Sequence, residues 1–341
     1  MKIQDIEQLI RPNIRSLAPY STARDEYEGP LGIYLDANEN PYENGYNRYP
    51  DPHQKVLKKR IAGIKGVPAE TVFIGNGSDE AIDLAYRIFC EPGVDNVVSI
   101  APTYGMYSVA ASINGVEFRE VLLNDDFSLD EEALFAAVDG HTKLLWICSP
   151  NNPSGNAFSQ EQLMRIIERF SGMVVLDEAY IDFAPESGFL SELEKYPNLI
   201  ILQTLSKAWG MAGLRLGLAF AAPRVIHLFS QVKYPYNINA ITQKLVLEEL
   251  EKPIGGQVAE IKVQRERVIR ELGRTGIIRK IFPSDANFVL VRVNEPRNVY
   301  QALIEAGIIV RDRSRMPRCE GCLRITIGTP AENDRMLEVL K

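Results

Sequence analysis

Short apolar segments that alternate with helical patterns constrain this chain more than any other feature of its sequence. Between about residues 55 and 240, seven segments are rich in β-branched residues and are apolar along most of their length. Such strands are typical of a sheet that helices cover on both faces. The alternation predicts an α/β fold with a mostly parallel seven-stranded sheet between helices. The expected strands are 71–74, 96–100, 115–121, 143–148, 173–177, 199–204 and 216–220.

Two helix starts can be read from capping residues. Ser159 and Gln162 have the spacing of a capping box, and apolar residues follow them at helical spacing. Ser78 is expected to cap a second helix, whose apolar face runs from Ala81 to Ile88. Both helices follow expected strands, as an α/β layer requires.

The pattern of strand-like and helical segments changes after about residue 240. A long charged helical region, 240–273, precedes strand-like segments at 286–293, 307–310 and 322–328, with a helix near 296–306. This pattern predicts a smaller α+β domain. We expect a large domain over 31–241, and a small domain made by 242–341 with an N-terminal arm, 1–30.

Charge and hydrophobicity exclude several classes of protein. The 341-residue chain carries a net charge of −7, which argues against general binding of nucleic acids or anionic membranes. No run of about 18 apolar residues is present, so we expect no membrane span. The first 17 residues lack the apolar core of a signal peptide. We therefore expect a cytoplasmic protein.

The cysteines and histidines do not suggest a metal site. Cys90 and Cys148 lie in apolar contexts and are expected in the core. Cys319 and Cys322 form a single C-x-x-C pair, whereas a structural zinc site needs four ligands. The three histidines are isolated in the sequence. We expect no metal.

Polar residues follow most of the expected strands, and in a parallel sheet these strand ends meet at one edge, where ligands bind. A glycine turn, "GNGSDE", follows the first strand; it can hold a phosphate on free N–H groups, although its two carboxylates would oppose an anion. "SPNNPSG" could be only a turn, and Tyr104 and Tyr180 could be core rings. Lys207 stands among small and apolar residues, which suits an amine of lowered pKa. No Gly-Lys pair occurs, so a P-loop is excluded.

Several motifs together resemble those of a known family. They are "LDANENPY" (35–42), "NRYP" (47–50), "PTYGMY" (102–107), "SPNNPSG" (149–155), "DEAY" (177–180), "TLSKAWGMAGLR" (204–215) and "GCLRITIGT" (321–329). In this order they resemble pyridoxal-5′-phosphate (PLP) aminotransferases of fold type I, class II. More narrowly, they resemble the histidinol-phosphate aminotransferase family.

The resemblance implies a role for each matching residue. Lys207 forms the Schiff base with PLP, Asp177 binds the pyridine nitrogen, and Tyr180 and Asn152 hydrogen-bond the ring oxygen. Tyr104 stacks on the ring. The cofactor phosphate is held by the N–H groups of Ser78 and Asp79 and by Ser206 and Arg215. The substrate contacts are Tyr20, Tyr49, Asn152, Arg311 and Arg324, with Tyr49 expected to come from the second subunit of a homodimer.

The implied reaction is transamination between L-histidinol phosphate and 2-oxoglutarate, giving imidazole acetol phosphate and glutamate. The two amino donors are glutamate, which carries a carboxylate, and L-histidinol phosphate, which carries a phosphate. Arginines suit both, because the guanidinium binds carboxylate or phosphate bidentately. Threonine-phosphate decarboxylase and an aromatic amino-acid aminotransferase remain alternatives. The segment 313–320, "RSRMPRCE", has no firm counterpart in the family, and for Arg313, Arg315 and Arg318 a solvated loop is the preferred interpretation.

Overall fold

Seven strands form the large sheet, and each overlaps one of the seven segments expected from the sequence. The computed structural model describes residues 5–18 and 32–341. The sheet order is β1-β7-β6-β5-β4-β2-β3, and β7 is antiparallel to both of its neighbours while all other pairs are parallel. Six strands therefore end at the same edge. The strands are β1 Val72–Asn76, β2 Asn96–Ala101, β3 Glu117–Leu122, β4 Thr142–Cys148, β5 Met173–Asp177, β6 Leu199–Thr204 and β7 Leu216–Ala221.

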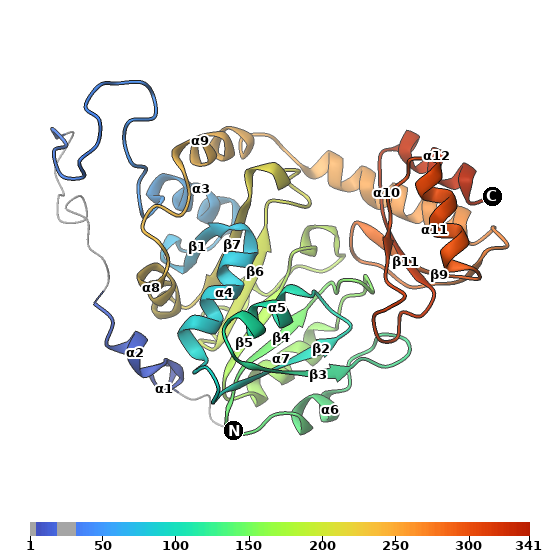
Figure 1. Ribbon diagram of the computed structural model, residues 1–341, viewed down its shortest axis with the longest axis horizontal. Coiled ribbons are helices and arrows are strands. Elements are labelled where there is room, and N and C mark those ends of the chain that lie inside the picture. Colours follow the sequence, from blue (N-terminus) through green and yellow to red (C-terminus); the bar gives the residue numbers. More distant parts are fainter. Residues whose placement is uncertain (1–4, 19–31) are drawn as a thin grey trace.

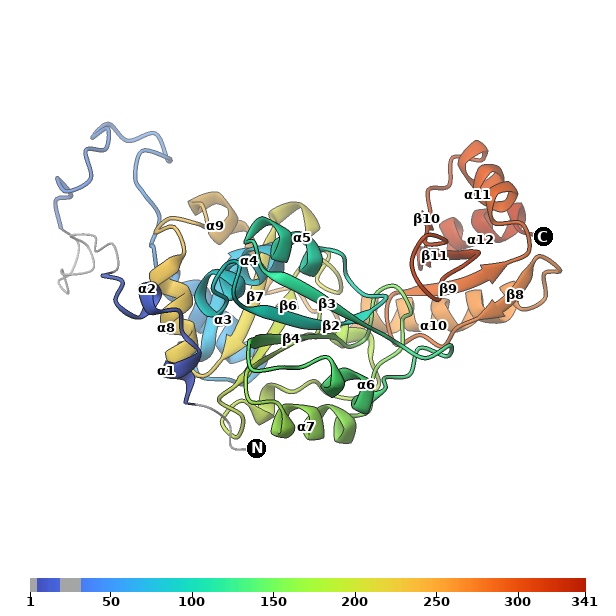
Figure 2. The same cartoon turned by 60° about the horizontal axis from the view of Figure 1, so that its bottom comes forward.

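Helices cover both faces of this sheet. Side chains alternate along β5, so Met173 and Val175 pack with the core around α4, α5 and α8, while Val174 and Leu176 pack with the core around α3, α6 and α7. Figure 2 shows α4 and α5 on one side of the sheet and α6 and α7 on the other. The helices are α3 Lys55–Lys65, α4 Gly77–Phe89, α5 Met106–Ile113, α6 Glu131–Ala136, α7 Gln160–Arg169 and α8 Pro223–Val232. Two short helices, α1 Ile6–Leu9 and α2 Pro12–Arg15, precede them.

A second, antiparallel sheet forms the smaller part of the molecule, beyond the large sheet (Figure 1). Its order is β10-β11-β9-β8. The apolar side chains of β9 and β11 pack against α10, α11 and α12 in a separate core. The division at residue 241 stays a proposal. The elements are α9 Ala240–Glu249, α10 Gly255–Leu272, β8 Ile278–Ile281, β9 Phe288–Val293, α11 Pro296–Glu305, β10 Arg311–Asp312, β11 Cys322–Thr326 and α12 Pro330–Val339.

The structure corrects three local expectations. Ser78 does not cap α4, because the helix begins at Gly77, which has a positive φ of 69°. The box at α7 is half formed: Ser159 accepts from the Gln162 N–H, but the Gln162 amide donates to the Leu129 carbonyl instead. The segment 307–310 is not a strand, and only the next two residues pair with β11.

Two further differences concern the small sheet and the helical region before it. The strand β8, "IRKI", was not expected, because it is short and its two charged residues face solvent. The region 240–273 is two helices, with the break at 250–254 around Pro253. The four cysteines are buried free thiols. Among the described residues, no helix is long and apolar enough to cross a membrane, and no cluster of side chains could hold a metal ion.

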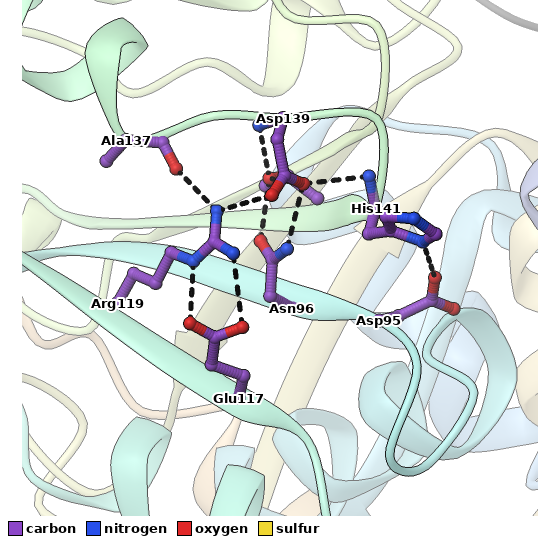
Figure 3. A network of polar contacts seen from close by, with 8 residues as sticks. Asp95, Asn96, Glu117, Arg119, Ala137, Asp139 and His141 are labelled. Carbon is purple, nitrogen blue, oxygen red and sulfur yellow. Dashed lines mark hydrogen bonds and ion pairs between the residues drawn. The ribbon is translucent and has the colours of Figure 1, made fainter.

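At the amino ends of β2, β3 and β4, charged side chains pair with one another (Figure 3). Arg119 donates to both oxygens of Glu117, at 2.9 and 3.1 Å, and to Asp139 at 2.7 Å. Asp139 also accepts from the Asn96 amide at 2.9 Å and from the His141 N–H at 2.8 Å. The hydrogen bond from Asn96, followed by that from Arg119, lowers the pKa of Asp139 far below its usual value.

Candidate active site

A cavity of about 450 Å³ lies at the opposite edge of the large sheet, where β1, β4, β5 and β6 end. Residues of β10 and β11 close it from the small sheet. Eleven of the thirteen residues expected in the site line this cavity. The full lining is Gly77, Ser78, Asp79, Tyr104, Cys148, Asn152, Asp177, Ala179, Tyr180, Thr204, Ser206, Lys207, Ala212, Arg215, Arg311, Arg313 and Arg324.

Lys207 follows β6, three residues beyond its last residue, and its amine opens onto the cavity. The Nζ atom lies 5.7 Å from the centre of the Tyr180 ring. The side chain is exposed to the cavity, but the surrounding walls displace much of its water. This desolvation, followed by the positive charge of Arg324, lowers the pKa of Lys207. A larger share of neutral amine at neutral pH follows, and neutral amine is the nucleophilic form.

Asp177 is the last residue of β5 and is buried at the floor of the cavity. Its Oδ2 accepts from the Tyr107 hydroxyl at 2.5 Å, and its Oδ1 accepts from the Ala179 N–H at 3.0 Å. Burial raises the pKa of Asp177, and these hydrogen bonds oppose that rise. A cation placed beside this carboxylate would favour its ionised form.

Tyr107 is a site residue that the sequence interpretation missed. Its ring stacks on Trp146, with centroids 4.8 Å apart, and Trp146 stacks on Tyr86. The Tyr86 hydroxyl donates to the Tyr107 carbonyl at 2.8 Å. The stack fixes the hydroxyl that holds Asp177. A signal was present in "PTYGMY", because its second tyrosine lies only three residues after Tyr104, and the two rings meet edge-on with centroids 5.6 Å apart.

The first turn of α4 forms an anion-binding end of the cavity. The N–H groups of Ser78 and Asp79 have no acceptor within the helix, because they lie in its first turn. Gly77 donates to the Arg215 carbonyl at 2.7 Å, and a Cβ at Gly77 would lie 2.7 Å from the Arg215 guanidinium. β7 also passes close behind this turn, and a Cβ at Gly217 would overlap the backbone of Gly77 and Ser78.

The acidic residues of "GNGSDE" take different positions. Glu80 turns back onto its own turn, where Oε2 accepts from the Asn76 N–H at 2.6 Å. Asp79 lines the cavity, but its carboxylate is paired with Arg215 at 3.4 Å and accepts from the Tyr104 hydroxyl at 3.1 Å. With the Ser206 hydroxyl, the donors at this end suit a phosphate group. The donor set, the acidic floor and the amine together fit PLP.

Asn152 and Tyr180 lie between this end and the small sheet. The Oδ1 atom of Asn152 accepts from Nη1 of Arg324. Tyr180 is buried, and its ring packs edge-on against Phe288 of β9, with centroids 5.1 Å apart. Burial is the main cause that raises the pKa of Tyr180. Its hydroxyl therefore stays protonated and can donate a hydrogen bond.

Three arginines, Arg311, Arg313 and Arg324, line the end of the cavity formed by β10 and β11. The interpretation of Arg313 as part of a solvated loop was wrong, because its side chain faces the cavity. Arg318 is also not free in solvent: it donates to Asp125, at 2.6 Å, and to the Leu123 carbonyl. Arg315 is exposed, as expected.

Two expected substrate contacts are not brought into this cavity. Tyr49 is half-exposed and stacks on Tyr236, with centroids 4.4 Å apart, away from the cavity lining. Its expected entry from a second subunit stays a prediction. Tyr20 lies outside the described residues.

Comparison with known proteins gives consistent matches over nearly the whole chain. The family model of aminotransferases of class I and II matches residues 35–340. A histidinol-phosphate aminotransferase of Parabacteroides distasonis is 52% identical over 341 residues, covering 99% of both chains. The structure of the histidinol-phosphate aminotransferase from Clostridium acetobutylicum has a TM-score of 0.79 and 26% identity, covering 86% of this chain and 90% of that one. The Sinorhizobium meliloti enzyme of the same name, in complex with PLP, has a TM-score of 0.80 and 27% identity, covering 86% and 82%.

Proposed function

Because the chain belongs to the class I and II aminotransferases, we propose that it transfers the amino group of L-histidinol phosphate to 2-oxoglutarate. The products are imidazole acetol phosphate and glutamate, and the cofactor is PLP. This assigns the chain to histidine biosynthesis. Support comes from the 52% identical relative that bears the name of this activity.

The observation that carries the proposal is the convergence of three kinds of group in one cavity. A desolvated amine, Lys207, faces a buried carboxylate, Asp177, and anion donors stand at both ends. One end suits the phosphate of the cofactor, and the other suits the anionic group of a donor. If the cavity bound an anion only at the cofactor-phosphate end, the arginines at the other end would be left without a ligand.

The cofactor-binding residues divide into three roles. When bound, PLP supplies an electron sink that allows an amino group to move between donor and acceptor. Asp177 would pair with its pyridine nitrogen, with Tyr107 keeping the carboxylate in place. Ser78, Asp79, Ser206 and Arg215 would hold its phosphate, and Tyr104, Asn152 and Tyr180 would contact its ring.

Lys207 has the proton-transfer role. Its amine would hold the aldehyde carbon of the cofactor and, once the donor takes that place, carry a proton to and from the donor α-carbon. General acid–base catalysis of this kind contributes about 10²- to 10⁴-fold to rate. The lowered pKa of Lys207 suits both tasks, because the amine must release and take up a proton near neutral pH.

The substrate contacts, the dimer and the location in the cell are also proposals. Arg311, Arg324 and Asn152 would bind the donor, and a homodimer would bring Tyr49 of one subunit to the other. Tyr20 would complete the same pocket. The cytoplasmic location rests on the sequence alone.

A donor screen at fixed 2-oxoglutarate tests the proposed function. L-Histidinol phosphate should give the highest kcat/KM, with glutamate as product and no release of CO₂. A higher kcat/KM for phenylalanine would indicate an aromatic aminotransferase. Stoichiometric CO₂ from phosphothreonine would indicate a decarboxylase.

A further inference from the structure

Three guanidiniums share one face of the β10–β11 hairpin. Arg311 stands directly opposite Arg324 in the antiparallel ladder, and the ladder continues when the Arg313 N–H donates to the Cys322 carbonyl at 2.9 Å. Residues two apart along a strand point to the same side, as do residues directly opposite each other. The register therefore aims all three side chains at the cavity, which they line.

The described part of the chain supplies no carboxylate to neutralise these charges. Within the described ranges, no carboxylate forms an ion pair with any of the three guanidiniums. The Nε groups of Arg313 and Arg324 are buried without a hydrogen-bond partner. Burial, followed by the charges of Arg324 and Arg311, lowers the pKa of Arg313 to about 10. Like charges directly opposite each other destabilise a hairpin, so this end of the cavity is built for an anion.

The three arginines at this end supply more positive charge than a donor that carries a carboxylate requires. Arg311 and Arg324 can match a carboxylate, which carries one charge and two acceptor oxygens. A phosphate monoester carries up to two charges and three acceptor oxygens. Arg313 stands on the same face as the other two arginines and supplies both the third fork of donors and the additional charge.

We propose that Arg313 is a specificity residue that makes this end of the cavity prefer a phosphate monoester dianion over a carboxylate. The inference rests on the proposed function and adds the residue that separates the two donor classes. Arg311 and Arg324 then serve both donors, whereas Arg313 serves mainly the phosphorylated one. Its neighbour in sequence, Arg315, is exposed and outside the cavity, and is the matched control.

Calorimetric titration of the PLP-loaded enzyme with methyl phosphate and with acetate tests this preference without turnover. Saturation with PLP keeps methyl phosphate from the cofactor's own phosphate site. In Arg313→Gln the affinity for methyl phosphate should fall about tenfold or more, the size expected for a lost hydrogen bond to a charged group. The affinity for acetate should change less than about threefold. Arg315→Gln should leave both affinities unchanged.

Steady-state kinetics give an independent reading. In Arg313→Gln, KM for L-histidinol phosphate should rise while KM for glutamate and kcat stay near their wild-type values, and Arg313→Lys should recover part of the loss. Equal weakening of methyl phosphate and acetate, or no change in either, would overturn the proposal. The two calorimetric titrations remain readable even if the wild-type enzyme proves inactive on histidinol phosphate, which would instead contradict the proposed function.

Discussion

The two edges of the large sheet differ in whether their charged side chains are paired within the chain. At the amino edge, Arg119, Glu117 and Asp139 are joined to one another, so their charges are compensated within the chain (Figure 3). At the carboxyl edge, Arg311 and Arg313 face a cavity without a carboxylate partner among the described residues. The strand β4 reaches both edges, but of the two groups of charged residues only the arginines beside the cavity are left for a ligand to pair with. Charged side chains without an ion-pair partner therefore indicate the binding site better than charged side chains in general.

The largest expected effect is a loss of turnover on substitution at the carboxyl edge, with no such loss at the amino edge. Lys207→Ala should reduce turnover by about 10³-fold or more, because the chain loses both its covalent hold on the cofactor and its proton carrier. The fold should persist, because within residues 5–18 and 32–341 the Lys207 side chain has no hydrogen-bond or ion-pair partner and lies 5.7 Å from the centre of the Tyr180 ring. Arg119→Ala at the other edge should leave kcat/KM unchanged and lower the melting temperature slightly. Steady-state assays and thermal unfolding of both variants check the contrast.

A second change tests the anion-binding turn. Gly217→Ala places a methyl group against the backbone of Gly77 and Ser78, so the turn must move. We expect a loss of about 1–3 kcal/mol in the free energy of unfolding, and weaker binding of PLP measured by equilibrium dialysis. Gly213→Ala is the control, because nothing lies within 4 Å of a Cβ there. Unchanged PLP affinity in Gly217→Ala would remove this turn from the cofactor site.

A third change removes one hydroxyl. Tyr107→Phe leaves the stack on Trp146 intact but deletes the hydrogen bond to Asp177. The loss should raise the pKa of Asp177 and reduce kcat/KM by about 10- to 100-fold, the range for a hydrogen bond to a charged group. The pH dependence of the bound PLP absorbance should shift as well. A rate loss without that spectral shift would mean that Tyr107 only supports packing.

Two further effects concern the dependence of stability on pH, and they should have opposite signs at the two edges. The pKa of buried Glu178, next to Asp177, is raised from 4.5 to about 7, mainly by burial. Its folded state binds the proton more tightly than its unfolded state does, so stability falls as pH rises from about 4.5 to 7. Asp139 has a lowered pKa, so its contribution is present above an unfolded pKa of about 3.9 and is lost as pH falls below it.

Urea unfolding across pH checks these signs. Glu178→Gln should remove a fall of about 2–4 kcal/mol between pH 4.5 and 7. The buried Gln203 oxygen has no hydrogen-bond partner, so that amide can rotate to accept from the new side chain. Asp139→Asn should reduce the dependence of stability on pH only on the acid side of the curve. A Glu178→Gln curve parallel to wild type above pH 4.5 would contradict the raised pKa.

The sequence predicted the large sheet well because its strands are apolar throughout. β4, β5 and β6 are buried along nearly their whole length, and a run such as "LIILQT" suits few other structures. β8 was missed because "IRKI" is half exposed and carries no such signal. Residues at strand ends, such as Asp177 and Lys207, were placed correctly in one cavity because parallel strands end together.

The misses share a physical reason, which is dependence on a partner far away in the sequence. The role of Tyr107, which lies in α5, needs Asp177, which comes 70 residues later at the end of β5. The direction of Arg313 depends on its pairing with Cys322, which sets the face of the hairpin that points inward. The expected role of Tyr49 would need a second chain, and it stays a prediction. Local patterns carry none of this information.

Borohydride reduction of the purified protein, followed by mass spectrometry of its peptides, tests the central assignment most directly. We predict a yellow protein with PLP absorbance, and one reduced PLP adduct on the peptide that contains Lys207. A colourless protein that takes up no added PLP, or an adduct on a different lysine, would contradict it.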